Sequence, residues 1–583
     1  MNIKNLVWQF LIEAGKPELL QYLEYPTDSR MGDVALPCFI LAKELKLSPM
    51  QIAENLAEEL QWWEHISKVL ATGPYVNITM DWSKLGVELI TDIEQEKENY
   101  WRTNPLGSAV SPLSGGMQVN TEKILVESPW PNTNKPLHLW HVRNMLLGNS
   151  VADILSFAGY DVHRVDIVND RGIHICKSML AYQKLWNGAE PNKKSDHYVW
   201  SWYVAYDAAL KENPEWEIEN QEMLRKREDG DQEIRDLWKT MNKWCLDGHA
   251  ITYERYGTII EKTYLESDHY LAGKDMVLEW LDKGLFRENE KWNIVADLSN
   301  EQEKVVLRSD GTSIYLTQDL ALGKVRYEDY HMDRMIYVVG NEQNDHFKAL
   351  FEIFGQLWYE FADQCYHLSY GMIALPDGKM KSRTGNVVDA DNLADDMTAQ
   401  CVDLLVERYP ELDMSEVERR AEIIAMAAIK MFVLKYDASK NFVFDKESSL
   451  AFDGETGPYV LYTYARAKTI LSKVSRAERG WKKLKHAENE IQQVSQDEQL
   501  LLASVARFGE MVQEAADQYA PTIIAKFVLW LASDFNSYYH HTKILDETVD
   551  ETTTQFRLGL VVSVAQVLHN GLKLLGIETL EQM

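Results

Sequence analysis

The segment from Lys123 to Val168 alternates between extended and helical patterns, and this alternation limits the fold more than any other feature. Residues 124–126 form a short apolar run that predicts a strand, residues 142–157 carry the pattern of an amphipathic helix, and residues 161–168 predict a second strand. A strand, a crossover helix and a further strand pack as a parallel sheet with helices on its faces. The sequence therefore predicts an α/β domain with a Rossmann-like parallel sheet, in which ligands bind beyond the carboxyl ends of the strands.

The N-terminal part of the chain predicts a separate small domain. Residues 1–110 alternate between helical and extended patterns and indicate an α+β module, with a helix expected at 50–60 and a strand at 75–80. Residues 106–116 are rich in Gly, Ser and Pro, a composition typical of a linker.

The remaining chain is expected to form a Rossmann-like domain at 118–450 and an all-α helical bundle at 451–583. A helical insertion rich in Trp and in charged residues is predicted within the first of these, at about 175–285. The extended pattern returns at 304–307, 313–316 and 335–339. In the C-terminal domain the apolar periodicity predicts helices at 459–477, 497–518, 521–541 and 553–575.

Length, charge and cysteine content limit the class of protein. A chain of 583 residues is too long for one hydrophobic core, and a formal net charge of −30 argues against nonspecific nucleic-acid binding by the surface as a whole. The five cysteines include no C-x-x-C pair, which favours a reducing cytoplasm and disfavours a zinc site. No apolar run approaches the ~20 residues of a membrane span. We therefore expect a cytoplasmic protein that has no structural metal and does not enter a membrane.

Two histidines three residues apart mark the turn from the first strand into the helix. His138 and His141 would share one helix face, at a helix start whose free N–H groups and dipole attract anions. Their imidazoles can donate hydrogen bonds to a triphosphate, chiefly where charge builds in the transition state. Helix-capping or core histidines are the alternative, but Asn132 and Lys135 just upstream favour a phosphate site.

A second candidate segment is the glycine-bounded loop at 378–386. It carries three cations in five positions, from Lys379 to Arg383. A mobile cationic loop can close over phosphates and leave with the product. Because basic surface loops are common, this segment alone does not establish a site.

Two further polar segments follow predicted strands. In the segment 307–319 a tight turn leads into a predicted strand that ends at Asp319, and Tyr315 would line the same pocket wall. A buried carboxylate needs a cationic partner, and a guanidinium ligand would serve through a bidentate pair. Polar residues at 339–346 lie at the carboxyl end of another strand, although a solvated turn would have the same composition.

Together these segments resemble a class I aminoacyl-tRNA synthetase, and specifically the arginyl-tRNA synthetase family. The run 131–141 resembles the His-Ile-Gly-His signature of the class, and Lys-Met-Lys-Ser-Arg at 379–383 resembles a degenerate Lys-Met-Ser-Lys-Ser loop. Residues 168–172 and 309–319 are similar to blocks of the arginyl family, and 456–466 resembles the start of its anticodon-binding domain. The N-terminal module is similar to the arginyl-specific extension that contacts the tRNA elbow. The resemblance covers essentially the whole chain.

The resemblance implies an arginine–tRNA ligase that forms arginyl-adenylate from arginine and Mg²⁺–ATP and transfers the arginyl group to tRNA(Arg). A monomer that needs bound tRNA for activation is the family expectation. The catalytic residues that it implies are His138, His141, Lys135 and Lys379, with Lys135 substituting for the lysine that Ser382 replaces. The implied ATP-binding residues are Pro131, His138, Trp140, His141, Met380, Lys381, Ser382 and Arg383. The implied arginine-binding residues are Glu127, Asn132, Tyr315, Asp319 and Gln343, with Asp319 paired to the guanidinium.

The sequence departs from the family pattern at two tryptophans. Trp140 occupies the glycine position of the histidine signature, where glycine permits the adenine ring to approach the backbone, and Trp130 stands where a serine is expected. The indole of Trp140 would either fill the adenine space or turn aside and stack on the base. Two alternatives to an active arginine ligase therefore remain open. One is a catalytically impaired tRNA-binding relative, and the other is a class I ligase for another amino acid, such as cysteine or glutamate.

Overall fold

The computed structural model describes residues 3–26, 31–60, 65–102, 122–185, 188–374, 376, 388–474, 491 and 494–583. The chain divides into two compact units. Residues 121–156 and 160–449 form one of them, which we call the sheet unit. Residues 1–120, 157–159 and 450–583 form the other, which we call the terminal unit. The predicted linker at 106–116 lies outside the described residues.

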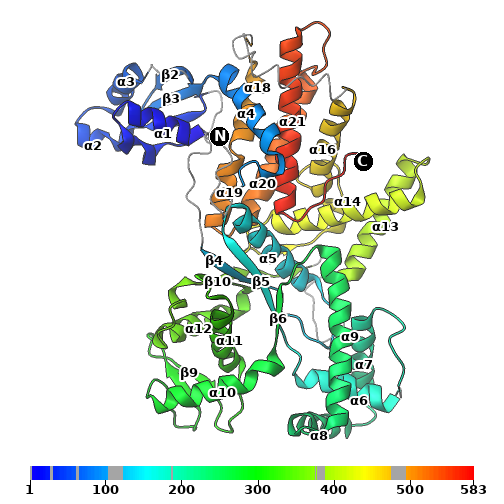
Figure 1. Ribbon diagram of the computed structural model, residues 1–583. Helices are drawn as coiled ribbons and strands as arrows, with labels where there is room; N and C mark the ends of the chain where they lie inside the picture. The colour runs from blue at the N-terminus through cyan, green and yellow to red at the C-terminus, as the bar shows by residue number, and fades with distance from the viewer. Residues whose placement is uncertain are drawn as a thin grey trace. The chain divides into compact units, whose positions relative to one another are not determined.

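Five strands in the order β11-β10-β4-β5-β6 form the centre of the sheet unit (Figure 1). They are β4 (Lys123–Glu127), β5 (Asp161–Val168), β6 (Lys262–Leu265), β10 (Arg334–Gly340) and β11 (Cys365–Tyr370). Every neighbouring pair is parallel, so the carboxyl ends of the strands meet at one edge of the sheet. The predicted Rossmann-like parallel sheet is confirmed.

Helix α5 (Leu139–Phe157) joins β4 to β5 and is buried on nearly every side, so the predicted amphipathic pattern is wrong. Its polar side chains fit inside because they have partners. Arg143 is 1% exposed and donates hydrogen bonds to the carbonyl oxygens of Asp437, Ala438 and Lys440. Asn144 donates to the carbonyl of Val338 in β10 at 2.7 Å, which fixes the helix against the sheet.

The insertion that follows β5 consists of four helices that lie together in Figure 1. They are α6 (Ile173–Leu185), α7 (Ser195–Ala209), α8 (Trp216–Asp229) and α9 (Gln232–Tyr256). The predicted extent of this insertion, 175–285, is wrong at its end, because β6 returns the chain to the central sheet beside β5 and α10 (Glu266–Asp282) follows it. The run Lys-Thr-Tyr-Leu is too short and too polar to announce a strand.

The chain between α10 and β10 differs from the prediction in two places. The predicted strand at 304–307 is β9 (Glu303–Leu307), but it pairs antiparallel with β8 (Ile294–Asp297) in a separate small sheet that also contains β7 (Arg287–Glu288). The predicted strand at 313–316 is wrong, because α11 (Tyr315–Tyr330) begins there. The backbone N–H of Ile314 donates to the Thr317 hydroxyl at 2.9 Å, and this bond closes the first turn of the helix.

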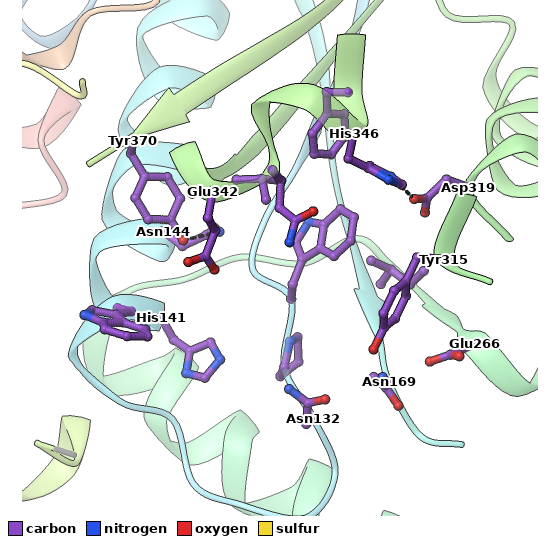
Figure 2. A pocket seen from close by; sticks show the side chains of 18 of the residues that line it. Asn132, His141, Asn144, Asn169, Glu266, Tyr315, Asp319, Glu342, His346 and Tyr370 are labelled. Atoms are coloured by element: carbon purple, nitrogen blue, oxygen red, sulfur yellow. Dashed lines mark hydrogen bonds and ion pairs between the residues drawn. The ribbon is translucent and has the colours of Figure 1, made fainter. Parts of the chain in front are cut away.

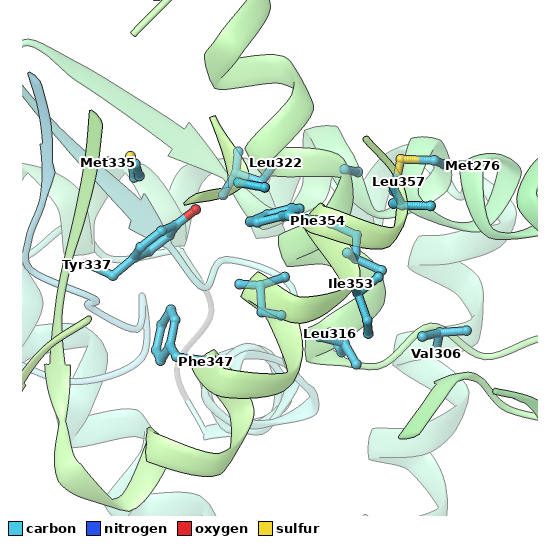
Figure 3. Packing of buried hydrophobic residues seen from close by; sticks show 14 of the residues in the cluster. Met276, Val306, Leu316, Leu322, Met335, Tyr337, Phe347, Ile353, Phe354 and Leu357 are labelled. Atoms are coloured by element: carbon cyan, nitrogen blue, oxygen red, sulfur yellow. The ribbon is translucent and has the colours of Figure 1, made fainter. Parts of the chain in front are cut away.

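One apolar cluster fixes α10, α11 and α12 (Asn344–Gln356) against β10. Figure 3 shows Phe347 and Phe354 of α12 packed among residues of the neighbouring elements. A Cβ atom at Gly323 of α11 would lie 2.5 Å from the Phe354 ring, so glycine is required for this close approach of α11 and α12. The cluster thereby holds in place the two helices that carry Asp319 and His346.

The N-terminal part of the terminal unit is an α+β module. Its antiparallel sheet has the order β1-β3-β2, with β1 (Val34–Pro37), β2 (Ile66–Thr72) and β3 (Tyr75–Met80). Its longer helices are α1 (Ile3–Glu13), α3 (Pro49–Glu59) and α4 (Trp82–Glu96). The strand predicted at 75–80 and the helix predicted near 50–60 are confirmed, and Ser48 caps the helix by accepting from the backbone N–H of Gln51.

The C-terminal part of the terminal unit is helical, as predicted. Its helices are α16 (Gly457–Ser472), α18 (Gln496–Ala506), α19 (Phe508–Asp517), α20 (Pro521–His541) and α21 (Glu551–Leu574). The helix predicted at 521–541 matches α20, whereas the one predicted at 497–518 is divided at Arg507 into α18 and α19. Among the described residues, no helix is long and apolar enough to cross a membrane.

Asp166 on β5 is a buried carboxylate whose ionisation should affect the stability of the protein. The residue is 1% exposed, and one carboxylate oxygen has no hydrogen-bond partner among the described residues. Burial raises its pKa from an ordinary value of 3.8 to about 7, although Thr263 opposes the shift. The folded state therefore holds the proton more tightly than the unfolded chain, and this contribution to stability is present below pH 3.8 and is lost as the pH rises through about 7.

We expect Asp166→Asn to remove this loss, because the amide does not ionise. The measurement is the difference in melting temperature between the variant and the unchanged protein, taken from thermal unfolding. We expect this difference to be more favourable to the variant at pH 8.5 than at pH 5.5. An equal difference at the two pH values would show that Asp166 is not a buried titrating group.

Candidate functional site

A cavity of about 340 Å³ lies at the carboxyl edge of the central sheet (Figure 2). Its walls come from the chain after β4, from α11 and from the chain after β10. Eight residues predicted from the sequence line it: Pro131, Asn132, His138, Trp140, His141, Tyr315, Asp319 and Gln343. Because the parallel strands place these segments side by side, the cavity lies where such a fold binds its ligands.

The two signature histidines lie against each other at one end of the cavity. Their ring centroids are 3.8 Å apart, and the backbone N–H of His138 donates to Nδ1 of His141 at 3.1 Å. Since Nδ1 of His141 accepts this bond, the neutral ring carries its proton on Nε2. His141 therefore offers the cavity an N–H donor.

Burial keeps both imidazoles uncharged near neutral pH. It lowers the pKa of His138 to about 3, helped by the positive charge of Lys135, and it lowers the pKa of His141 well below the ordinary value. The Nζ of Lys135 lies 3.4 Å from Nε2 of His138, and Lys135 is not among the residues that line the cavity. This end of the cavity thus combines the N–H donor of a neutral His141 with a neutral His138 and a nearby lysine.

Helix α9 of the insertion holds the turn that precedes the histidines. Nε2 of His249 lies 2.9 Å from the carbonyl oxygen of Lys135, and the Thr133 hydroxyl donates to the side-chain oxygen of Asn242 at 2.6 Å. Both helix residues are buried. The position of Lys135 therefore depends on the insertion, a connection that the spacing of residues in the sequence did not reveal.

The backbone on the other side of His138 pairs with the start of α13 (Ala390–Arg408). The N–H of Leu139 donates to the carbonyl of Val388 at 3.0 Å, and the N–H of Ala390 donates to the carbonyl of Leu137 at 2.9 Å. The chain that leads into this pairing contains the predicted cationic loop, but Lys379, Met380, Lys381, Ser382 and Arg383 lie outside the described residues.

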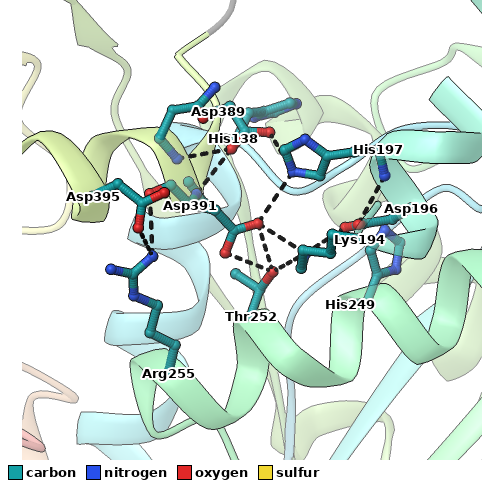
Figure 4. A network of polar contacts seen from close by, with 12 residues as sticks. His138, Lys194, Asp196, His197, His249, Thr252, Arg255, Asp389, Asp391 and Asp395 are labelled. Carbon is teal, nitrogen blue, oxygen red and sulfur yellow. Dashed lines mark hydrogen bonds and ion pairs between the residues drawn. The ribbon is translucent and has the colours of Figure 1, made fainter. Parts of the chain in front are cut away.

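A polar network anchors the same part of α13 to the insertion (Figure 4). The side chains of Asp196, His197 and Asp391 lie close enough to surround a cation. Nζ of Lys194, however, lies 2.7 Å from Asp196 and 2.8 Å from Asp391, and His197 is 3.3 Å from Asp391. The protein's own ammonium group thus neutralises this cluster.

Trp140 lies at the histidine end of the cavity. Its indole N–H donates to the carbonyl oxygen of Ile373 at 3.2 Å, and its ring stands edge-on to His138 with centroids 5.7 Å apart. Trp130 also lines the cavity, edge-on to Phe347 at 6.2 Å. Both tryptophans are therefore in contact with the space that a ligand would occupy.

The opposite end of the cavity is acidic. Tyr315 and Asp319 lie one turn apart on α11 and face the cavity together, and Nε2 of His346 lies 2.7 Å from Oδ2 of Asp319. Glu266, at the start of α10, adds a second carboxylate, whose pKa is raised by burial and which accepts a bond of 2.8 Å from Gln318. The sequence did not reveal Glu266, because it follows β6, the strand that was missed.

Glu127 differs from its predicted place. It was expected to contact the amino acid, but it is fully buried, is paired with Arg326 of α11, and does not line the cavity. The two charges neutralise each other between β4 and α11. In this arrangement Glu127 supports the wall that carries Asp319. Its buried partner lies too far along the chain for local sequence to identify.

Three family models match the chain. They are the class I (R) tRNA synthetase catalytic domain at residues 111–446, the DALR anticodon binding domain at 460–583, and the arginyl-tRNA synthetase N-terminal domain at 1–80. The arginine–tRNA ligase of Treponema denticola is 41% identical over 573 residues, which cover 96% of this chain and 94% of the relative. That of Porphyromonas gingivalis is 39% identical over 580 residues, with 95% and 94% covered.

Solved structures agree in fold. The arginyl-tRNA synthetase of Thermus thermophilus superposes with a TM-score of 0.80 at 24% identity and covers 100% of this chain and 99% of its own. That of Plasmodium falciparum gives 0.79 at 18% identity with the same coverage. The catalytic-domain model matches more than half of this chain, and relatives near 40% identity match almost all of it. The chain therefore belongs to the arginyl-tRNA synthetase family of class I aminoacyl-tRNA synthetases.

Proposed function

We propose that this chain is an arginine–tRNA ligase. A carboxylate oxygen of arginine attacks the α-phosphorus of ATP, and pyrophosphate leaves. A ribose hydroxyl of the terminal adenosine of tRNA(Arg) then attacks the carbonyl carbon of the adenylate, which forms the arginyl ester and releases AMP. The observation that carries this proposal is that one cavity holds the carboxylates of Asp319 and Glu266 at one end and two neutral imidazoles, with Glu342 nearby, at the other.

The acidic end suits the side chain of arginine. A guanidinium group matches a carboxylate through two parallel N–H···O bonds, and charge-assisted bonds of this kind are each worth roughly 1.5–3 kcal/mol. Asp319 and Glu266 supply two such acceptors, with Tyr315 beside them. Glutamate would be repelled by these carboxylates, and cysteine would leave them unpaired, so both alternative substrates are disfavoured.

The histidine end suits the phosphates of ATP, which enters with Mg²⁺ as part of the substrate. The Nε2–H of His141 donates to phosphate oxygens, and the N-terminus of α5 attracts their charge. Lys135 adds a positive charge behind His138. We assign to Lys379, Met380, Lys381, Ser382 and Arg383 the role that the resemblance implies, contact with the phosphates as pyrophosphate departs.

The terminal unit suits tRNA binding. The helical region matched by the anticodon-binding model would receive the anticodon, and the N-terminal module would contact the tRNA elbow. With a formal net charge of −30, the chain must gather its tRNA contacts on limited basic surfaces. We propose that the enzyme acts as a monomer in the cytoplasm.

The direct test is ATP–pyrophosphate exchange with purified protein, with and without tRNA(Arg). We expect exchange that depends on arginine and increases when tRNA(Arg) is present, together with formation of arginyl-tRNA. Exchange supported better by cysteine or glutamate would overturn the substrate assignment. Binding of tRNA(Arg) without any exchange would establish an impaired relative instead.

Asp319 provides a test of the acidic end. Asp319→Asn removes the charge that faces the guanidinium, so the KM for arginine in the exchange assay should rise about 10- to 100-fold while the KM for ATP changes less than about threefold. Equal increases in both constants would mean that Asp319 supports the fold of the cavity and does not select its ligand.

Trp140 provides a test of the ATP end. If the indole, held by the Ile373 carbonyl, packs on the adenine, Trp140→Ala should raise the KM for ATP about 2- to 10-fold, since such contacts are worth ~0.5–1.5 kcal/mol, and Trp140→Phe should recover most of the loss. A lower KM for ATP in Trp140→Gly, or exchange gained only in that variant, would identify the indole as an obstruction.

A further inference from the structure

We propose that His346 is a positioning residue for Asp319. By fixing the direction of the Asp319 carboxylate, it makes the acidic end of the cavity selective for a planar guanidinium over other cations. This inference rests on the proposed function, because it assumes that Asp319 receives the side chain of the substrate. It concerns a residue that neither the signature motifs nor the predicted arginine-binding set includes.

The contact is direct and sheltered. Nε2 of His346, near the start of α12, lies 2.7 Å from Oδ2 of Asp319 on α11. Asp319 is only 8% exposed, and both side chains line the cavity (Figure 2). Within the described ranges no other hydrogen bond to the Asp319 side chain is found. His346 therefore takes one lone pair of Oδ2, and the second lone pair of Oδ2 and those of Oδ1 are available to the two N–H groups of a guanidinium.

The second carboxylate is held in the same manner. Gln318, next to Asp319 on α11, donates its amide N–H to Oε1 of Glu266 at 2.8 Å. Each acid at this end of the cavity therefore has one oxygen bound by a neighbouring side chain. A carboxylate whose rotation is restricted in this way presents a fixed direction to the ligand.

A fixed carboxylate discriminates between cations by shape. The guanidinium of arginine is a rigid fork that needs its acceptors in one plane, whereas the ammonium of lysine is a compact charge that bonds in many directions. Loss of His346 would leave the negative charge in place but free the carboxylate to rotate. Arginine should then lose affinity, and lysine should lose little or none.

The aromatic surroundings give His346 its own support and supply a matched control. Its ring stands edge-on to Phe347, with centroids 5.3 Å apart. His367 of β11 packs on the same Phe347 ring at 4.4 Å, but its Nε2 lies 3.0 Å from the carbonyl of Val339 and makes no contact with Asp319. The two histidines share a packing partner and differ in the carboxylate bond.

The test is ATP–pyrophosphate exchange with His346→Ala, His346→Gln and His367→Gln in the full chain with tRNA(Arg), with lysine as a competing inhibitor. We expect His346→Ala to raise the KM for arginine about tenfold, to leave the KM for ATP within twofold, and to lower the preference for arginine over lysine by a similar factor. His346→Gln keeps a donor near the Nε2 position and should recover most of the loss. His367→Gln should match the unchanged protein.

The double variant His346→Ala/Asp319→Asn distinguishes the proposed substrate site at Asp319 from the proposed role of His346. If His346 acts through Asp319, His346→Ala should change the KM for arginine much less in the Asp319→Asn background. An unaltered KM for arginine in Asp319→Asn itself would overturn the proposed substrate site. A full effect of Asp319→Asn, with none of His346→Ala, would overturn only the role of His346. Should His346→Ala fail to fold, His346→Asn, whose shorter amide does not reach Asp319, takes its place in the same comparison.

Discussion

The parallel pairing of β4 with β5 and β10 is the constraint on which the site depends. Because the three strands run in the same direction, the turn before α5, the chain after β5 and the chain after β10 meet at one edge. The buried helix α5 is fixed to β10 of this sheet through Asn144. The cavity is therefore a consequence of strand order, and its chemistry comes from the residues at the strand ends.

Burial disfavours charged side chains at both ends of the cavity, and the hydrogen bonds around the titratable groups distinguish the two ends. At one end, burial keeps His138 and His141 neutral, so they act as hydrogen-bond partners and not as charges. At the other end, Asp319 and Glu266 are sheltered but each accepts a bond from a neighbouring side chain. Under the proposed function, a substrate with a cationic side chain and a reacting carboxyl group would place its cation at the acidic end and its carboxyl group toward the histidines.

Much of the fold could be predicted from the sequence, because β3 and α20 have clear periodic patterns and boundaries and β5 ends in a largely apolar run. The site was predictable where it lies on motifs, as for His138, Tyr315 and Asp319. It was not predictable where a local pattern misleads or where long-range packing decides. Glu266 was missed because the strand before it, β6, is half polar. A strand was predicted where α11 begins, at a turn closed by the hydroxyl of Thr317. The pairing of Glu127 with Arg326 depends on segments that are distant in the sequence.

Under the proposed function, one cavity holds arginine at its acidic end and the adenylate phosphate at its histidine end. A crystal structure with a non-hydrolysable arginyl-adenylate analogue tests this arrangement most directly. We expect the guanidinium at about 3 Å from the carboxylates of Asp319 and Glu266, and the phosphate mimic within hydrogen-bond reach of His141. An analogue bound in the reverse orientation, or outside this cavity, would contradict the claim.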